Sequence, residues 1–530
     1  MLKQKILQDL QKAVEELGLP STDLVLSIPK NPAFGDYTSN IALQLVKQSS
    51  ANGKQSLDEI AKKISQKMKD LNYLEKVEVV NGFVNFFVKP EKLAEDLQEI
   101  LEQGENFGQS NFGKGKKARV EYVSANPTGP LHFGNARGGP IGDVLANVLE
   151  FCGYGVLREY YDNNVGGQVT KLGESIANTK AGGNPEDQEY KGEYVAEIVD
   201  KIGNFKDAKE AGEKAVDLLF HEIIKDCADL GIKFDQVYHE SGFVNIGATK
   251  KVLDELEKKD LLKKYEGAIW FAPKDEFLQD RECVVVKSDG EYTYFANDIA
   301  YHKVKFVENP DLVINILGAN HHGHVPRLQA AITALGFDAK RYKVILYQWV
   351  RFKKGEELIK MSKRSGTFVT AREVLDEVGK DALRFSLLQY SPQTHIDLDL
   401  DLYKQKSSKN PVFYVQYAHA RMSNIIKKSD QDGKEVDYSQ LKDNHELNLI
   451  KHLLYFPDLV TAISQTLQVQ NLTEYAISLA DLFHRFYEAC PVLQAGSGSL
   501  KDARLALMKA SKITLANTLK LLGVSAPERM

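Results

Sequence analysis

The sequence is poor in cysteine and lacks long apolar runs. Its 530 residues include four cysteines, Cys152, Cys227, Cys283 and Cys490, which lie far apart and form no C-x-x-C pair. This spacing argues against a disulfide framework and against a structural zinc site, so we predict no protein-bound metal. No run of 18 apolar residues is present, which argues against a membrane span. The first residues lack a signal-peptide pattern, and we therefore expect a cytoplasmic protein.

The chain also lacks an excess of positive charge. Its 68 lysines and arginines are outnumbered by 73 aspartates and glutamates, which gives a formal net charge of −5. Proteins that bind nucleic acids usually carry a basic surface, so this composition is weak evidence against such a partner. A local basic stripe is still compatible with the sum, because lysines cluster at Gly113–Lys117, Lys353–Arg364 and Lys404–Lys409.

No internal repeat or low-complexity tract is present, but the pattern of the sequence changes along the chain. Residues 1–89 combine helical periodicity with two strand-like runs, which predicts a small α+β domain. Residues 90–117 are a predicted linker. Strands and helices alternate over 118–378, which predicts a mostly parallel α/β core with a Lys/Glu-rich insertion at 182–292. From 379 to 530 the pattern is almost wholly helical, which predicts an α-helical bundle.

A glycine-containing turn joins a predicted strand to a predicted helix in the α/β region. The strand Val120–Val123 leads into Ser124–Pro130 and then into His132-Phe133-Gly134-Asn135. Free N–H groups at a helix N-terminus, with a histidine and an asparagine beside them, can donate hydrogen bonds to phosphate. The alternative is a tight turn in which His132 only caps the helix.

This segment resembles the H-I-G-H signature of class I aminoacyl-tRNA synthetases, and the string V-E-Y-V-S-A-N-P-T-G-P-L-H is similar to the version found in arginyl-tRNA synthetases. Such enzymes have a split Rossmann-type nucleotide-binding core. Asn135 departs from the signature, because asparagine can donate a hydrogen bond but cannot carry a proton. The resemblance implies that ATP is bound by Pro127, Gly129, His132, Gly134 and Asn135.

A lysine-rich segment, Lys360-Met361-Ser362-Lys363, follows much later in the chain. Lysines on a glycine-containing loop can stabilise the charge that builds on a departing polyphosphate, although most such clusters are simply solvated loops. All four positions match the K-M-S-K signature of class I synthetases. The resemblance implies ATP contacts from all four residues, and catalytic roles for Lys360 and Lys363 together with His132 and Asn135.

Tyr294 and Asp298 are four residues apart at the start of a predicted helix, so they share one face. A carboxylate beside a phenol can receive a guanidinium, and the resemblance implies arginine binding by this pair with Glu121, Ser124 and Asn126. The alternative is that Tyr294 belongs to the core and Asp298 caps the helix.

The block Gly318-Ala319-Asn320-His321-His322-Gly323-His324 contains three histidines, which raises the alternative of a zinc site. The spacing is poor for one helix face. The resemblance instead implies that Gly318 and His321 contact ATP and that His321 also contacts arginine. Asn320 is a second departure, because the family often has aspartate there.

Residues in the last and first parts of the chain complete the resemblance. Asp381-Ala382-Leu383-Arg384 would by itself be an ordinary amphipathic turn, but it matches the D-A-L-R sequence of an anticodon-binding helical domain. The resemblance implies tRNA contacts in two regions: Phe83 and Asn85 near the tRNA elbow, and Tyr414, Tyr417, Arg421 and Met530 near the anticodon.

The expected function is therefore that of an arginine–tRNA ligase, which uses ATP with Mg²⁺ and binds L-arginine and its tRNA. We expect a monomer without a membrane partner. Three alternatives are a cysteinyl-type synthetase, for which zinc ligands are lacking, a tRNA-binding paralogue without catalysis, and a small-molecule nucleotidyltransferase. Intact lysines at 360 and 363 and the large helical bundle argue against the last two.

Overall fold

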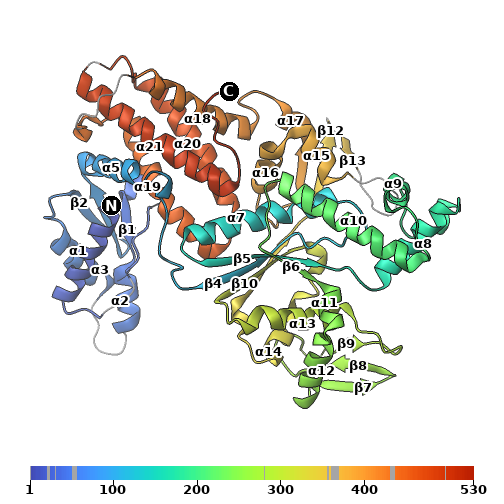
Figure 1. The fold of residues 1–530 in the computed structure, drawn as a ribbon. Coiled ribbons are helices and arrows are strands. Elements are labelled where there is room, and N and C mark those ends of the chain that lie inside the picture. Colours follow the sequence, from blue (N-terminus) through green and yellow to red (C-terminus); the bar gives the residue numbers. More distant parts are fainter. Residues whose placement is uncertain are drawn as a thin grey trace.

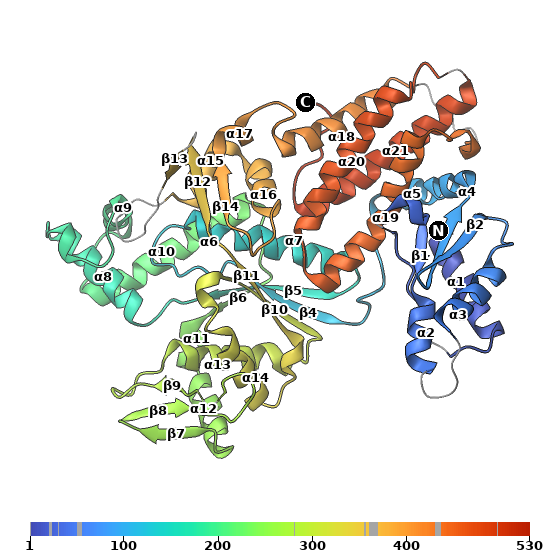
Figure 2. The same cartoon turned by 180° about the vertical axis from the view of Figure 1, so that it is seen from behind.

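The computed structural model describes residues 2–20, 24–29, 31–49, 56–279, 281–354, 357–359, 369–429, 436–495 and 497–530. Figure 1 shows a central twisted sheet, a helical bundle above it and a small N-terminal domain beside the bundle. The opposite view separates a small α/β lobe below the sheet from a helical extension at its side (Figure 2). This is the predicted fold class, and its strands and helices follow the predicted order.

The N-terminal domain places helices against one face of a three-stranded antiparallel sheet with the order β1-β3-β2. Its elements are α1 (Leu2–Glu16), η1 (Pro32–Phe34), β1 (Tyr37–Ser39), α2 (Ile41–Ser49), α3 (Leu57–Met68), β2 (Leu74–Val80) and β3 (Phe83–Val88). Asn81 and Gly82 both have positive φ and form the tight turn between β2 and β3, the residue pair that two-residue hairpins favour.

The predicted linker is wrong over its first half. Residues 90–106 form α4 (Pro90–Glu95), α5 (Leu97–Gln103) and η2 (Gly104–Asn106). The apolar side chains of Leu93, Leu97 and Ile100 are buried, which an exposed linker would not allow. These helices lie against the bundle (Figure 1), and Asn517 of the bundle donates hydrogen bonds to the carbonyls of Gly104 and Phe107. They therefore join the N-terminal domain to the bundle.

The central α/β unit is built on a five-stranded parallel sheet with the order β11-β10-β4-β5-β6. Its elements are β4 (Lys117–Glu121), α6 (Phe133–Ala136), α7 (Gly138–Phe151), β5 (Gly155–Asp162), β6 (Gln236–His239), β10 (Leu312–Gly318), η4 (Ala319–His321), α14 (Val325–Ala334), η5 (Ala339–Arg341) and β11 (Tyr342–Tyr347). The sequence interpretation missed β6, because it assigned all of 182–292 to the insertion. Strand β6 is a short edge strand with only two apolar residues, so its pattern is weak.

Two smaller units are inserted around this sheet. The helical extension contains α8 (Gly167–Lys180), η3 (Pro185–Asp187), α9 (Glu193–Ile202) and α10 (Ala208–Asp229), with its own apolar core. The lobe below the sheet contains α11 (Glu240–Asn245), α12 (Ala248–Lys258), the antiparallel strands β7 (Leu262–Tyr265), β8 (Ala268–Phe271) and β9 (Cys283–Val286), and α13 (Tyr294–Val307). Helix α13 of this lobe packs against the five-stranded sheet, where Lys305 contacts β4 and Tyr301 contacts β5.

A third small sheet with the order β13-β12-β14 connects the core to the bundle. It comprises β12 (Val350–Lys354), β13 (Glu357–Ile359) and β14 (Ile396–Asp399), with α15 (Ala371–Val378), α16 (Lys380–Leu388) and α17 (Leu400–Lys404) around it. The expectation of an almost wholly helical chain after 379 is therefore wrong at β14. The I-D-L-D sequence of β14 alternates apolar and polar residues as a half-buried strand does, and β14 pairs in parallel with β12.

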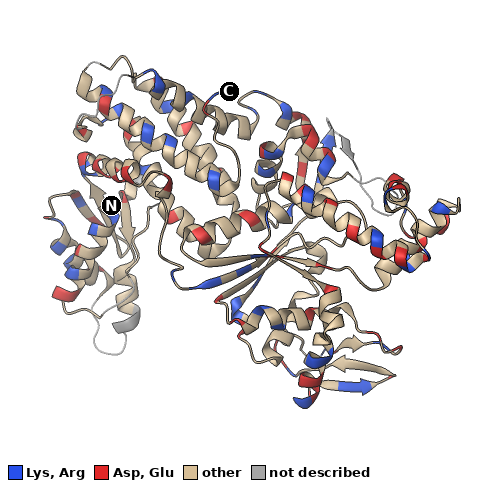
Figure 3. Ribbon diagram, viewed as in Figure 1, with Lys and Arg blue, Asp and Glu red and all other residues tan. Residues whose placement is uncertain are grey.

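The bundle consists of α18 (Pro411–Lys427), η7 (Tyr438–Gln440), α19 (Asn444–Thr466), α20 (Gln470–Ala489) and α21 (Gly498–Leu522). Basic and acidic residues are both scattered along the helices, between longer stretches of uncharged residues (Figure 3). All four cysteines are buried and free. None of the described helices has the length and apolar composition needed to cross a membrane.

Arg384 of the D-A-L-R sequence joins the bundle to the core. Its guanidinium is fully buried and lies 2.5 Å from a carboxylate oxygen of Asp143 on α7. It also donates to two carbonyls, Leu230 at the end of α10 and Leu522 at the end of α21, each at 3.0 Å. One side chain thus connects α7, α10 and α21.

Candidate functional site

The turn after β4 is strained where the sequence predicted a ligand site. Val123 and Ser124 have φ of 68° and 37°, a region that a β-branched residue such as valine rarely adopts. The strained turn brings the Ser124 hydroxyl 2.9 Å from a carboxylate oxygen of Glu121, and the same hydroxyl accepts a hydrogen bond from the Tyr161 N–H. The turn therefore connects the carboxyl ends of β4 and β5, where ligands bind in open parallel sheets.

His132 caps the short helix α6, as the simpler alternative predicted. Its Nδ1 accepts a hydrogen bond from the Gly134 N–H at 2.9 Å. A neutral ring that accepts at Nδ1 carries its proton at Nε2, so Nε2 is a hydrogen-bond donor. Capping and a role in binding are therefore compatible for this residue. Asn135 lies on α6 itself.

The chain returns to His132 after the lysine segment. Lys360, Met361, Ser362 and Lys363 lie outside the described residues. Further along the chain, the carbonyl of Val369 accepts a hydrogen bond from the Phe133 N–H at 3.1 Å. Thr370 forms a β-bridge with His132, and the Ala371 N–H donates to the Leu131 carbonyl at 2.8 Å. Residues 369–371, which come after the lysine segment in the sequence, therefore lie beside His132.

Glu121 already has a cationic partner within the protein. It lies in a row across three strands with Asn315 of β10 and Glu159 of β5. The Lys305 ammonium from α13 lies above this row, 2.5 Å from Glu121, 2.7 Å from Asn315 and 3.7 Å from Glu159. Arg119 forms a second buried ion pair with Glu159, with Nε at 2.6 Å. Two buried cations therefore balance two buried carboxylates.

Tyr294 and Asp298 begin α13, and both lie on the face that their spacing predicted. Thr293 is the N-cap, and Tyr294 is 47% exposed, so the alternative of a capping Asp298 and a core Tyr294 is wrong. A carboxylate oxygen of Asp298 lies 2.7 Å from Nε2 of His324. This pair joins α13 to the histidine block after β10.

Asn126 and its neighbours are held from three sides. The Asn126 amide donates to Gln168 at 2.9 Å and accepts from Asn163 at 2.8 Å. Tyr194 of α9 donates a hydrogen bond to the Thr128 carbonyl at 3.3 Å. The insertion, in which the sequence showed no obvious catalytic cluster, therefore contacts the turn that contains Pro127 and Gly129.

The histidine block separates into different environments. Gly318 ends β10, His321 lies in η4 and is exposed, and His324 binds Asp298. The pKa of His321 is lowered, first by desolvation of its ring and then by the charge of His324. His321 lies near enough to Asp298 and Glu121 for both carboxylates to oppose this shift.

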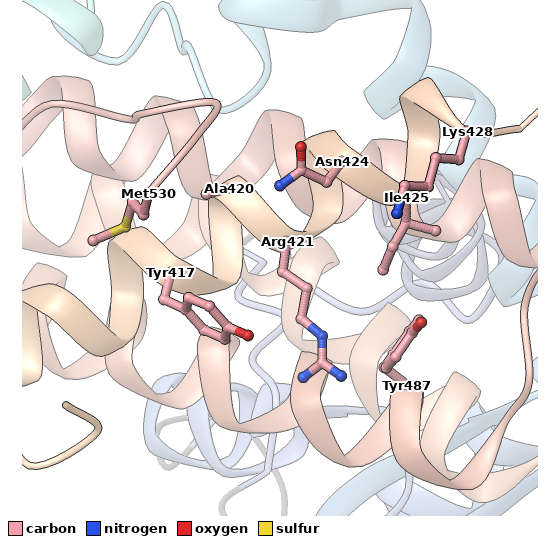
Figure 4. A pocket seen from close by; sticks show the side chains of 8 residues that line it. All are labelled: Tyr417, Ala420, Arg421, Asn424, Ile425, Lys428, Tyr487 and Met530. Atoms are coloured by element: carbon pink, nitrogen blue, oxygen red, sulfur yellow. The ribbon is translucent and has the colours of Figure 1, made fainter. Parts of the chain in front are cut away.

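A pocket of about 230 Å³ opens on the helical bundle (Figure 4). Arg421 projects into it, and its guanidinium lies 4.4 Å from the ring centre of Tyr487. The other lining residues are Tyr417, Ala420, Asn424, Ile425, Lys428 and Met530. A second hollow, which shares Tyr417 with the first, includes Tyr414 and His484. Three predicted tRNA-binding residues thus line one pocket, and Tyr414 lies in the hollow next to it.

Comparison with known proteins finds matches to three family models along the chain. Residues 1–88 match the arginyl tRNA synthetase N terminal domain, 96–215 and 186–389 match the catalytic domain of class I (R) tRNA synthetases, and 415–530 match the DALR anticodon binding domain. The arginine–tRNA ligase of Caldanaerobacter subterraneus is 40% identical and is matched over 98% of its length by 100% of this chain. The chain belongs to the arginyl-tRNA synthetase family.

Membership of this family makes the chain an arginine–tRNA ligase of class I, and ligases of this class use ATP. The arginine–tRNA ligase of Anoxybacillus flavithermus is 37% identical, with 100% of this chain and 99% of the relative covered. The solved structure of the Thermus thermophilus arginyl-tRNA synthetase shares the fold with a TM-score of 0.81, at 23% identity and with 100% of both chains covered.

One predicted tRNA-binding residue of this synthetase is buried. Asn85 is 2% exposed, and its side-chain oxygen accepts a hydrogen bond from the Thr38 hydroxyl at 2.6 Å. Asn85 therefore holds β3 to β1 and has no surface for RNA. Phe83, two residues earlier, is 39% exposed beside the Asn81–Gly82 turn.

The sequence analysis missed three buried charged residues of this synthetase, namely Arg137, Glu240 and Lys305. Each is at most 1% exposed. Arg137 directly follows α6 and donates to the carbonyls of Gln348, Ser391 and Thr394. Burial of this guanidinium lowers its pKa to about 10. Only the tertiary structure distinguishes these residues from ordinary charged surface residues.

Proposed function

We propose that arginine activation takes place at the carboxyl edge of the central sheet. The supporting observation is the pairing of His132, in the first signature motif, with Thr370, which comes after the lysine segment in the sequence. ATP would lie over α6 and the turn before it, near Pro127, Gly129 and Gly134. His132 and Asn135 would donate hydrogen bonds to the phosphates, and Gly318 and His321 would contact the nucleotide from the other side.

The arginine side chain would bind between α13 and the turn after β4. Asp298 would supply a carboxylate for the guanidinium, and Tyr294 a hydroxyl or ring contact. Asn126 would bind the α-amino group. Glu121 and Ser124 would act through hydrogen bonding and shape, because the Lys305 ammonium already compensates the Glu121 charge. His321 would close the site above them.

In the first step the arginine carboxylate would attack the α-phosphorus in line and displace pyrophosphate. Lys360 and Lys363, with Met361 and Ser362 between them, would hold the departing pyrophosphate and stabilise its charge. A hydroxyl of the terminal adenosine of tRNA would then attack the adenylate and release AMP. We infer that Mg²⁺ arrives on the ATP phosphates, since Asp298 and Glu121 are both occupied by cationic or histidine partners.

The bundle of 379–530 would read the anticodon, with its pocket as the contact surface. Exposed tyrosines can stack on unpaired bases, and a basic side chain can contact phosphate. Tyr417 and Arg421 have this combination on one face of α18, Met530 lies at the same pocket, and Tyr414 belongs to the adjoining hollow. The domain of 1–89 would contact the tRNA elbow through Phe83. We further infer a monomeric, cytoplasmic enzyme.

ATP–pyrophosphate exchange with each of the twenty amino acids, with and without tRNA, tests this assignment. Exchange with arginine alone, and only when tRNA is present, is the expected result. Exchange with a different amino acid would overturn the roles of Tyr294 and Asp298. Size-exclusion chromatography coupled to light scattering tests the monomer, and a mass near twice 59.4 kDa would contradict it.

A further inference from the structure

Folding brings a cysteine beside a histidine and an aspartate at one end of the helical bundle. Helices α19 and α20 are joined by the short connection 467–469 and therefore form an antiparallel hairpin. The start of α19, with Asp443 as its N-cap and His445 in its first turn, thus lies beside Cys490, the C-cap of α20. The spacing of the cysteines along the sequence did not show this group, because both helices separate Cys490 from the other two residues.

The three side chains converge. One ligand atom of each, a carboxylate oxygen of Asp443, Nδ1 of His445 and Sγ of Cys490, lies within 4.8 Å of the other two. The Asp443 oxygen and Nδ1 of His445 are 2.8 Å apart, and the thiol is within hydrogen-bond reach of the same carboxylate. The ligand atoms of a tetrahedral zinc ion lie roughly 3–4 Å from one another, so small side-chain rotations allow one ion to contact all three.

This cluster has a buried base and an exposed rim. Cys490 is 1% exposed, whereas the side chains of Asp443 and His445 are 46% and 47% exposed. A metal ion can therefore enter from the solvent past the rim and reach a sulfur that the protein shields from other reactants. Thiolate, imidazole and carboxylate are the ligands that zinc prefers in proteins, and together they favour zinc over magnesium or calcium.

Neighbouring groups hold the ligands in place. The Asp443 carboxylate accepts hydrogen bonds from the backbone N–H groups of His445 and Glu446. The buried Glu446 carboxylate accepts from the Asp443 N–H at 2.9 Å and is paired with Nε of Arg504, on α21, at 2.6 Å. Arg504 also donates to the carbonyl of Pro491, the residue after the cysteine, at 2.7 Å. One arginine therefore fixes both sides of the cluster, as outer partners do around metal ligands.

The local charges admit a divalent cation. Among the described residues, Glu446 compensates the charge of Arg504, which leaves the Asp443 carboxylate and the Cys490 thiolate to balance the ion. The partial charges at the end of α20 and the start of α19 have opposite signs, so they offset one another. A hydrogen-bonded helix cap is the simpler alternative, and a nucleophilic cysteine is another. Burial and the charges of Glu446 and Asp443 raise the pKa of the thiol to about 12, which argues against a free nucleophile.

We propose that Asp443, His445 and Cys490 form a zinc site that clamps the end of the α19–α20 hairpin. Zn²⁺ binds one carboxylate oxygen, Nδ1 and Sγ, with water as the fourth ligand. It replaces the thiol proton and the Nδ1 proton, and both protons leave to the buffer. The site does not depend on the proposed arginine and ATP sites. It fixes the last turn of α20, which carries Tyr487 of the pocket in Figure 4.

The test is a titration of the full, reduced and metal-free chain with Co²⁺, followed by Zn²⁺. Cobalt occupies zinc sites, and a cobalt–thiolate bond gives a charge-transfer band in the near ultraviolet. The wild type should bind one Co²⁺ per chain with this band, and Zn²⁺ should abolish the band. Cys490→Ser should lose the band. His445→Asn, at an exposed position that leaves the fold intact by circular dichroism, should weaken Co²⁺ binding at least about tenfold.

Cys283→Ser is the matched control, because Cys283 is also buried but the charged groups that act on it are Arg281 and Arg327. It should keep the band and the affinity of the wild type. The clamp has its own readout in limited proteolysis. Zn²⁺ at about ten times its Kd should slow cleavage within 436–495 about tenfold in the wild type, and should leave Cys490→Ser unprotected.

Three outcomes would overturn the proposal. A wild type without the thiolate band, or a band that Cys490→Ser retains, excludes Cys490 as a ligand. Co²⁺ binding that His445→Asn leaves unchanged assigns the ion to other groups, such as the histidine block after β10. A normal band without protection from proteolysis by Zn²⁺ refutes the clamp.

Discussion

Replacing Arg384 by methionine should separate the bundle from the catalytic core. The change keeps much of the apolar stem but removes the cation that compensates Asp143, and it leaves the Leu230 and Leu522 carbonyls without their donor. Removing one partner of a buried ion pair destabilises by about 3–5 kcal/mol, because the remaining charge stays buried and unpaired. The fraction of molecules with an open interface should therefore rise by about two to four orders of magnitude.

Limited proteolysis and the rate of thermal inactivation would measure this opening without assuming two-state unfolding, which a chain of several domains need not follow. The control is Arg351→Met, which breaks the exposed pair with Asp397 and should cost less than about 1 kcal/mol. The double variant Arg384→Met with Asp143→Leu should recover most of the loss, because no charge is then left unpaired. A single Arg384 variant as resistant as the control, or a double variant no better than the single, would refute the reasoning.

Three further predictions concern the proposed site. Asp298→Asn should raise the arginine KM by about 10- to 100-fold with little change in kcat, measured by exchange in the presence of tRNA; weaker tRNA binding instead would contradict the site. Lys363→Ala should lower kcat by roughly a hundredfold or more and leave the arginine KM nearly unchanged, and an unchanged kcat would exclude the leaving-group role. Tyr417→Ala should weaken tRNA binding by about 5- to 150-fold in a filter-binding assay, whereas exchange at saturating tRNA should persist; normal affinity would remove Tyr417 from the RNA surface.

The elements that could be predicted from the sequence are those in which apolar residues recur with a clear helical or strand period. The bundle helices α18 to α21 lie in the region where helical spacing indicated them, whereas β4 spans Lys117–Glu121 instead of the predicted Val120–Val123. Strands β6 and β14 were missed because each has four residues, and a four-residue alternation carries little information. Residues 90–103 were assigned to a linker because the glycines that follow them dominated the interpretation, although Leu93, Leu97 and Ile100 have helical spacing.

The site was predicted unevenly for a related reason. Tyr294 and Asp298 could be placed on one helix face from their spacing alone, and the structure places them so. Lys305 and Glu240 could not be found in this way. A lysine in an amphipathic helix and a glutamate after a short strand are ordinarily exposed. Lys305 and Glu240 are buried because other elements pack over them in the folded protein. For Asn85 the error was the reverse. It was predicted to be exposed to RNA, like Phe83 two residues earlier, but its side chain is buried and hydrogen-bonded to Thr38.

The charge balance at the sheet edge bears on how the enzyme would choose arginine. If Glu121 were unpaired, any cation of suitable size could bind it, and lysine would compete with arginine. Lys305 occupies that carboxylate and fixes it in a row with Asn315 and Glu159. The carboxylate proposed for the substrate is Asp298, one oxygen of which is hydrogen-bonded to Nε2 of His324. An ammonium is a point charge, whereas a planar guanidinium can donate two parallel hydrogen bonds to one carboxylate and further bonds to polar neighbours. Because unpaired buried polar groups are costly, such a site can discriminate by roughly 10⁴–10⁵ without a separate editing reaction.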